Sequence, residues 1–199
     1  MRNVFILLVL LLTYATASAQ TERRIYTSSE LKSMQTRSEK SELTKEQKKQ
    51  IEAIRDSIHY AQAIQSLETL EFVMEADQLV FKRGQTAFVT STTNFISVSD
   101  DKVVVQIAPF YGGGPNGVGG ITLEGKASNI RIKTDKKGNT FFSMNVMGTG
   151  LSATIDIQLY KGSNKASVTV NPNFHSNRVT LNGVLLPTEY SSIHKGRAF

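Results

Sequence analysis

TIDIQLY at residues 154–160 and KASVTV at residues 165–170 are the stretches that decide the fold of this chain. Apolar and polar side chains alternate in both, which is the period of a β-strand with one buried and one solvated face. The segment between them, KGSN, has the composition of a tight turn. The pair therefore predicts an antiparallel hairpin whose inward-facing residues are Ile155, Ile157, Leu159, Ala166, Val168 and Val170.

The same alternation extends over residues 71–190, with Ile130 and Ile132 as a further example. Turn sequences separate the alternating runs, including DD at 100–101, DKKGN at 135–139 and GTG at 148–150. No helical pattern interrupts these runs, which argues against a parallel α/β sheet. We therefore expect a mainly β domain of about nine or ten strands, an antiparallel meander that closes into a lipocalin-like barrel or a two-sheet clam. A sandwich remains the alternative.

Residues 44–66 predict one amphipathic helix ahead of the β domain. The sequence TKEQ at 44–47 has the form of an N-terminal capping box. Ile51, Ile54, Ile58 and Ala61 then recur at helical spacing on one face, opposite charged side chains. Such a stripe should pack against something, which is either the β domain of this chain or a partner helix.

Residues 1–19 have the pattern of a secretory signal peptide. Arg2 precedes an apolar run over 4–12, and ASA at 17–19 matches a cleavage site, so we expect cleavage after Ala19. The run is about half of the roughly 20 apolar residues that span a bilayer. Residues 20–43 are polar and predict a flexible leader. We therefore expect an exported protein, periplasmic or extracellular, with no transmembrane segment after signal cleavage.

Candidate catalytic and metal-binding residues are few. The chain has no cysteine, so thiolate ligands, a thiol nucleophile and a lipidated cysteine are excluded. His59, His175 and His194 show no metal-site spacing, and no G-x-S-x-G serine motif occurs. The sequence predicts no catalytic residues, no metal and no cofactor. The polar face carrying Asp156, Gln158 and Tyr160 is expected to meet solvent, and the alternative is that it lines a barrel cavity.

A glycine-rich loop is the candidate ligand-binding segment. GGGPNG at 112–117 matches the letters of a dinucleotide motif, but proline lies inside it and a strand follows where that motif needs a helix. The simplest interpretation is a hairpin loop. The functional interpretation is a lid at a barrel mouth, because binding residues concentrate on loops of rigid scaffolds. The candidate ligand-binding residues are Phe110, Tyr111, Gly112, Gly113 and Gly114.

The formal net charge is +6, and the excess lies in the second part of the chain. From Gln78 onward thirteen Lys or Arg face six Asp or Glu, whereas residues 20–77 carry nine against eleven. Such an excess attracts anionic lipid headgroups, polysaccharide or nucleic acid. Here it is spread over turns and solvated faces with few aromatic residues between, so we expect a solvated surface and no nucleic-acid partner.

Several segments together resemble a known family. They are residues 72–77, Gly84, residues 94–98, residues 108–112 and residues 119–121. They are similar to the secreted family of Bacteroidota catalogued as domain of unknown function 4251, over about residues 72–186. The resemblance implies a lipocalin-like β architecture outside the cytoplasm, and it implies no reaction. The loop after Pro109 is richer in glycine than the family pattern, which leaves any loop-borne function of relatives in doubt.

Two functions remain open, and an enzyme is a third alternative. The first is non-enzymatic binding of a small apolar or amphipathic ligand in a barrel cavity within the envelope. The second is an interaction module whose helix docks on an envelope protein; it requires the stripe of Ile51, Ile54 and Ile58 to be exposed. An enzyme would need a cavity with converging ionisable groups.

Overall fold

The structure is a computed structural model that describes residues 29, 44–109, 114–174 and 177–198. By its contacts the chain divides into two units, Met1–Glu46 and Gln47–Phe199. Most of the first unit, with the expected signal peptide and leader, lies outside the described residues. None of the helices within the described ranges is long and apolar enough to cross a membrane. The second unit holds the rest of helix α3 and all the strands.

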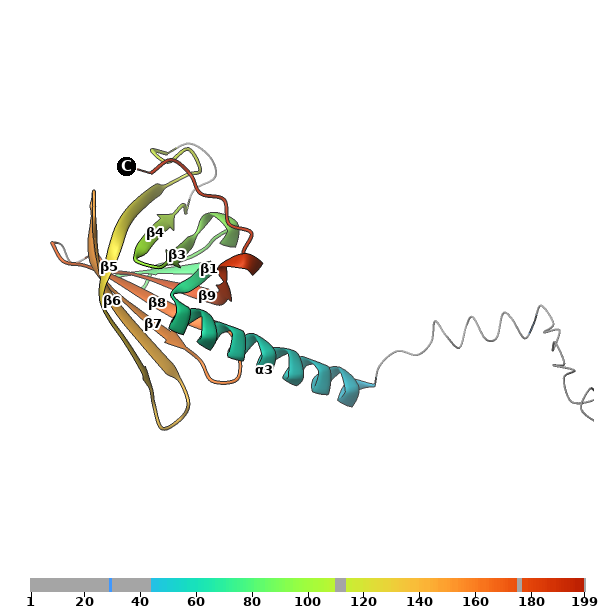
Figure 1. The fold of residues 1–199 in the computed structure, drawn as a ribbon. Helices are drawn as coiled ribbons and strands as arrows, with labels where there is room; N and C mark the ends of the chain where they lie inside the picture. The colour runs from blue at the N-terminus through green and yellow to red at the C-terminus, as the bar shows by residue number, and fades with distance from the viewer. Residues whose placement is uncertain (1–28, 30–43, 110–113, 175–176, 199) are drawn as a thin grey trace, which may run out of the picture. The chain divides into compact units, whose positions relative to one another are not determined.

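Within the described residues, nine antiparallel strands follow one another as a meander (Figure 1). Short 3-10 helices, η1 (Ser91–Thr93) and η2 (Thr188–Tyr190), precede β3 and follow β9. The strands are β1 (Glu71–Phe81), β2 (Thr86–Phe88), β3 (Phe95–Ser99), β4 (Lys102–Ile107), β5 (Ile121–Thr134), β6 (Thr140–Gly148), β7 (Leu151–Leu159), β8 (Lys165–Pro172) and β9 (Val179–Pro187).

The meander closes into a barrel because β1 pairs with the last strand, β9, from Phe72 opposite Pro187 to Phe81 opposite Val179. The other edge of β1 pairs with β3 near its start and with β2 near its end. Eight strands, β1 and β3 to β9, form the closed ring, and β2 lies beside the end of β1. The predicted barrel is confirmed, and a sandwich is excluded because every ring strand has two paired neighbours.

Alternation in sequence becomes alternation in burial, as the hairpin of β7 and β8 shows. The six predicted inward residues of this hairpin are all buried. Asp156 is exposed and accepts a hydrogen bond from Ser143 Oγ at 2.7 Å across the outer face. The alternative in which Asp156, Gln158 and Tyr160 line the cavity is therefore wrong, because their inward neighbours Ile155, Ile157 and Leu159 fill the opposite face.

Helix α3 (Lys45–Thr69) leads directly into β1 at one end of the barrel. It continues three residues beyond the predicted end, and Leu70 breaks it with a left-handed backbone conformation, φ 58°. Ala63 and Leu67 are fully buried in the barrel core, and Tyr60 and Ile64 pack against that core. The Tyr60 hydroxyl also donates to the Gly138 carbonyl, at 2.8 Å, in the β5–β6 turn. The last turns of the helix therefore seal this end of the barrel.

The predicted helix stripe is not the face that packs on the barrel. Ile51, Ile54 and Ile58 are 50%, 62% and 53% exposed. At about 100° per residue, the centre of this stripe lies roughly 160° around the helix from Tyr60, Ala63, Ile64 and Leu67. The isoleucine stripe therefore faces away from the barrel contact, and packing on this chain's own core leaves it uncovered.

The C-terminal segment, residues 188–198, runs back along the outside of the barrel (Figure 1). Ser191 Oγ and the Ser192 amide donate to the Glu75 carboxylate on β1, at 2.7 and 3.2 Å. The fully buried Gln106 on β4 then donates to the His194 carbonyl at 2.8 Å and accepts from the Gly196 amide at 2.8 Å. The segment is thus bound to the outer face of β1 and β4 by hydrogen bonds to two buried side chains. We call residues 188–198 the tail.

Candidate functional site

The meander assigns each connection to one of two barrel ends. Helix α3 enters at the first end, which also carries the turns at residues 100–101, 135–139 and 160–164. The second end, which we call the mouth, carries the four connections at residues 82–85, 108–120, 149–150 and 173–178. No helix covers the mouth in the described part of the chain.

An apolar pocket of about 410 Å³ opens at the mouth. This volume lies within the range of about 300–1,000 Å³ that is typical of small-molecule sites. Buried side chains form its floor, and the more exposed Ile121 and Phe174 stand at its rim. The lining residues are Val105, Ile107, Ile121, Leu123, Gly150, Leu151, Ser152, Ala153, Val170, Pro172, Phe174, Asn177 and Val179.

The pocket does not continue along the whole barrel. Large side chains that are fully buried fill the interior towards helix α3, and Phe72 and Phe142 meet there edge to face with ring centres 5.5 Å apart. Ala63 and Leu67 of the helix join the same core. The cavity expected from the barrel fold therefore lies at one end, where small residues such as Gly150 and Ala153 leave space.

A second, more open groove of about 520 Å³ adjoins the apolar pocket. The two share Ile107, Ile121, Asn177 and Val179, so they lie side by side. Phe81, Lys82, Arg83, Gln85 and Arg178 complete the lining of the groove. The apolar pocket thus adjoins a groove whose lining includes Lys82, Arg83 and Arg178.

The candidate residues chosen from the sequence fall between β4 and β5 in the chain. Phe110, Tyr111, Gly112 and Gly113 lie outside the described residues. Gly114 is described, exposed and left-handed at φ 70°, and an added Cβ would lie 2.7 Å from the Gly120 backbone nitrogen. Gly114 is not among the described residues that line the apolar pocket. Its glycine identity follows from the shape of the turn.

A buried asparagine organises the rest of this connection. Asn116 Oδ1 accepts from the amides of Val118 and Gly120, at 3.1 and 2.9 Å, and its Nδ2 donates to Thr122 Oγ1. Thr122 Oγ1 in turn donates to Gln106, at 2.7 Å. The Arg197 amide of the tail donates to the Asn116 carbonyl at 3.0 Å. The described half of the loop is therefore tied to the barrel wall and to the tail.

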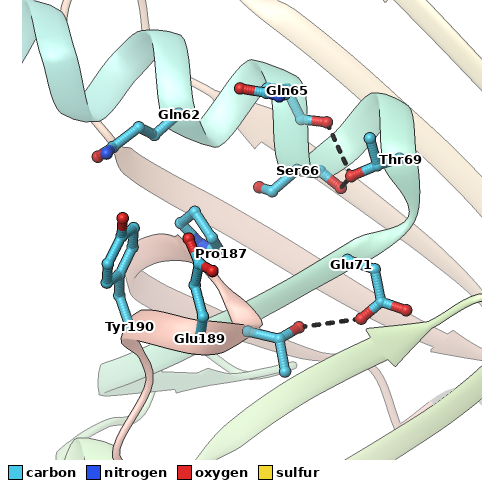
Figure 2. A pocket seen from close by; sticks show the side chains of 9 residues that line it. Gln62, Gln65, Ser66, Thr69, Glu71, Pro187, Glu189 and Tyr190 are labelled. Carbon is cyan, nitrogen blue, oxygen red and sulfur yellow. Dashed lines mark hydrogen bonds between the residues drawn. The ribbon is translucent and has the colours of Figure 1, made fainter.

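A polar cleft of about 440 Å³ lies at the opposite end, between helix α3 and η2 (Figure 2). Glu71 in this cleft accepts hydrogen bonds from Ser99 Oγ at 2.8 Å and Thr188 Oγ1 at 3.4 Å. Glu189, through a hydrogen bond and its negative charge, raises the pKa of the Tyr190 phenol. Glu71 and Glu189 thus interact with the side chains of neighbouring residues in the cleft or beside it. The other lining residues are Gln62, Gln65, Ser66, Thr69 and Pro187.

The remaining candidates from the sequence do not gather into a site. His59 is half-buried on helix α3, His194 is exposed in the tail, and His175 lies outside the described residues. Asp135 sits in the β5–β6 turn, where hydrogen bonds from the Asn139 side chain and from nearby backbone amides lower its pKa. No three His, Asp or Glu side chains come close enough to hold a metal ion in the parts of the chain that the structure describes.

Residues of the mouth pocket escaped the sequence analysis because three of its four connections carry no recognisable motif. Phe174 and Asn177 come from the β8–β9 connection, and Gly150 and Leu151 from the β6–β7 turn. A usable signal was present, since alternate hairpins of a meander meet at the same end. For the described residues, that rule places 82–85, 108–109, 114–120, 149–150, 173–174 and 177–178 at one end.

Comparison with known proteins identifies the family. The family model described as Domain of unknown function (DUF4251) matches residues 55–185. The crystal structure of a DUF4251 family protein from Bacteroides eggerthii is similar to this chain, with 47% sequence identity and a TM-score of 0.62. The match covers 74% of this chain and 99% of the other. A search of curated proteins found no match. This chain belongs to the DUF4251 family.

Proposed function

We propose that this chain is an exported, non-enzymatic protein that binds a small apolar or amphipathic ligand in the mouth of its barrel. The observation that carries the proposal is the apolar pocket of about 410 Å³, with a floor of buried side chains. Exposed apolar surface that is recessed and partly enclosed gains most from ligand burial, at about 25 cal/mol per Å². The described mouth residues include no pair of carboxylates or histidines, so binding fits this recess better than acid–base catalysis.

A neutral fluorescent probe, N-phenyl-1-naphthylamine, tests the pocket. We expect it to bind the wild type, and we expect the double variant Ile121→Ser/Phe174→Ser to bind about ten-fold more weakly, because two apolar rim contacts are lost. Fluorescence titration gives both dissociation constants. Phe88→Ser is the matched control, since Phe88 is 83% exposed on β2 and lines neither mouth recess. Equal weakening by the control, or no probe binding, would contradict the proposal.

The proposal also includes export of the protein and cleavage of its signal peptide. The apolar run over residues 4–12 and the ASA sequence at 17–19 support export and cleavage. Mass spectrometry of the protein isolated from its own cells should then show an N-terminus at Gln20. An intact N-terminus at Met1 would overturn the export proposal.

The exposed helix stripe favours a second function, docking of helix α3 on an envelope protein. Ile51, Ile54 and Ile58 lie at i, i+3 and i+7 and face away from the barrel contact. Three half-exposed isoleucines in a row have no role in the barrel core, and helix-in-groove recognition uses this spacing. Lys48 and Arg55 lie along one side of the stripe, which favours a partner with an apolar groove and acidic residues along one of its edges.

Site-specific photo-crosslinking in the native cells tests the docking proposal. A photoreactive residue at position 54 should give a discrete crosslinked product with a protein of different mass. The same residue at position 52, where Glu52 is exposed beside the stripe, is the control and should give little product. A product of twice the chain's mass would mean self-association, and no product at position 54 would also overturn the proposal.

A further inference from the structure

The two ends of the barrel differ in the net charge of the connections between their strands. The mouth connections read KRGQ, APFYGGGPNGVGG, TG and NFHSNR, which include Lys82, Arg83 and Arg178 and no Asp or Glu. All three acidic residues of the connections between strands, Asp100, Asp101 and Asp135, lie at the helix end. The helix end also holds Glu71 and Glu189 in its polar cleft. The helix-end connections also carry Lys136, Lys137 and Lys161, which match their three aspartates in number, whereas the cations of the mouth connections have no acidic counterpart in those connections.

The cations of the mouth stand beside its apolar pocket. Arg83 and Arg178 are exposed, and they line the same groove from the β1–β2 and β8–β9 connections. Ile107, Ile121 and Val179 line both this groove and the apolar pocket. A ligand that fills the pocket with an apolar chain and extends past these residues brings its polar end into the groove that both arginines line. Guanidinium groups bind carboxylate and phosphate through paired hydrogen bonds.

Among the described residues, neither Arg83 nor Arg178 takes part in an ion pair. The described ion pairs lie elsewhere, between Lys126 and Asp101 and between Lys195 and Glu124. Glu124, on the outer face of β5, is thus already paired with the tail. A negatively charged headgroup at the mouth therefore meets cations from two connections, whereas at the helix end it would meet carboxylates as well as lysines.

We propose that the mouth selects an anionic amphiphile, with its apolar chain in the pocket and its negatively charged headgroup held by Arg83 and Arg178. The inference rests on the proposed function, because it adds the charge of the ligand to the pocket that binds it. The ligand class is a single acyl-type chain with a carboxylate or phosphate head. Because each CH₂ placed in the pocket tightens binding about four-fold, chain length and head charge contribute separately.

Three probes with the same chain test the headgroup: dodecanoate and dodecyltrimethylammonium, each below its micelle-forming concentration, and dodecanol below its solubility limit. Calorimetric titration of the full mature protein should show that dodecanoate binds about ten-fold more tightly than dodecanol, the gain from two partly exposed ion pairs. The cationic probe should bind more weakly than dodecanol. Raising the salt concentration should weaken dodecanoate binding and leave dodecanol binding unchanged, because salt screens only the charge contribution.

Charge variants assign the effect to the two arginines. Arg83→Gln/Arg178→Gln should weaken dodecanoate binding about ten-fold and leave dodecanol binding within about two-fold. Lys136→Gln/Lys137→Gln, in the β5–β6 turn at the helix end, removes the same charge and should change neither probe. Dodecyl phosphate in place of dodecanoate distinguishes a phosphate head from a carboxylate head, and tighter binding of either supports the inference.

The outcomes separate this inference from the proposed function. If dodecanol and dodecanoate bind equally and the arginine variant changes neither, the headgroup inference fails and the apolar pocket stands. If the helix-end lysine variant weakens dodecanoate as much as the arginine variant does, net charge acts without a site and the inference also fails. If none of the probes binds, the proposed function itself fails.

Discussion

Replacing Gly183 with alanine is expected to lower the free energy of unfolding by about 4 kcal/mol, among the larger effects of a single substitution. Gly183 lies in β9 at the seam where the barrel closes, opposite Ala76 on β1 and Ala166 on β8. A Cβ at this position would lie 2.0 Å from the Glu75 carbonyl oxygen and 2.9 Å from the Ala76 Cα. Both atoms belong to the backbone, so relief requires the two strands to separate.

The seam has little freedom to make this adjustment. The pairing of β1 with β9 already shifts register between Ala76 and Gln78, so the extra residue of a bulge lies beside Gly183. Glu75 is held on the same strand by the tail residues Ser191 and Ser192. Moving the backbone of Glu75 away from a new methyl group would therefore disturb the ladder and the tail together.

Urea unfolding followed by circular dichroism measures the effect of Gly183→Ala. Gly162→Ala is the matched control, because Gly162 lies in the β7–β8 turn at φ 78° with no atom within 4 Å of an added Cβ. It should cost about 1 kcal/mol through backbone conformation alone. Equal losses in the two variants would show that close approach at the seam is not what Gly183 provides.

Replacing Gln106 with leucine is expected to cost about 3 kcal/mol. The Gln106 amide makes four hydrogen bonds: it donates to the Thr93 and His194 carbonyls and accepts from Thr122 Oγ1 and the Gly196 amide. Gln106 and Thr122 are both 0% exposed. Leucine has nearly the same size but leaves these four partners without their bonds, and each buried unpaired group costs about 1–3 kcal/mol.

The loss should be partly recovered by release of the tail, which would let its own groups bond to water. We therefore expect Gln106→Leu to make residues 191–198 sensitive to proteolysis in addition to lowering the unfolding midpoint. Gln158→Leu is the control, since Gln158 lies on the outer face of β7 and half-exposed substitutions of this kind change stability by less than about 0.5 kcal/mol. A Gln106 variant as stable as the control would contradict the proposed role of the amide.

The strands could be predicted from sequence because their information is local. The alternation around Ile155 and Ile157 has a period of two residues, which is the period of a β-strand with one buried and one solvated face. Closure of the barrel was also predictable in kind, since a long meander must protect its edges. The identity of the two closing strands could not be predicted, because the pairing of β1 with β9 joins opposite ends of the domain sequence.

The helix shows where local periodicity fails. Ile51, Ile54 and Ile58 make the clearest stripe in the sequence, yet the face that packs on the barrel holds Tyr60 and Leu67 on the other side. The packing face is short and mixed, since one of its buried members is Ser66, whose hydroxyl bonds to the Ala63 carbonyl. A pattern of apolar residues indicates which side of a helix is suited to burial. It does not indicate whether that side packs on the core of the same chain or on a partner protein.

The candidate ligand-binding residues were chosen from one connection, residues 110–114, whereas the pocket is lined by residues from several strands and connections. The glycine loop attracted attention because glycine is conspicuous in a sequence, whereas a pocket wall made of Val179, Leu151 and Val170 looks like ordinary strand residues. Buried Gln106 gave no signal either, because its partners lie up to 90 residues away in the sequence. Sites that are assembled from strand ends need the topology before they can be recognised.

Joining the first strand to the last one has a consequence for how the chain is made. Phe72 faces Pro187, so a growing polypeptide contains no complete ring until β9 has been synthesised. Pairings between such distant segments are also slow to form, because the intervening chain must lose conformational entropy before the stabilising contacts form. The nascent chain therefore stays open until β9 has emerged, and until then the apolar faces of its strands are not sealed inside a closed ring.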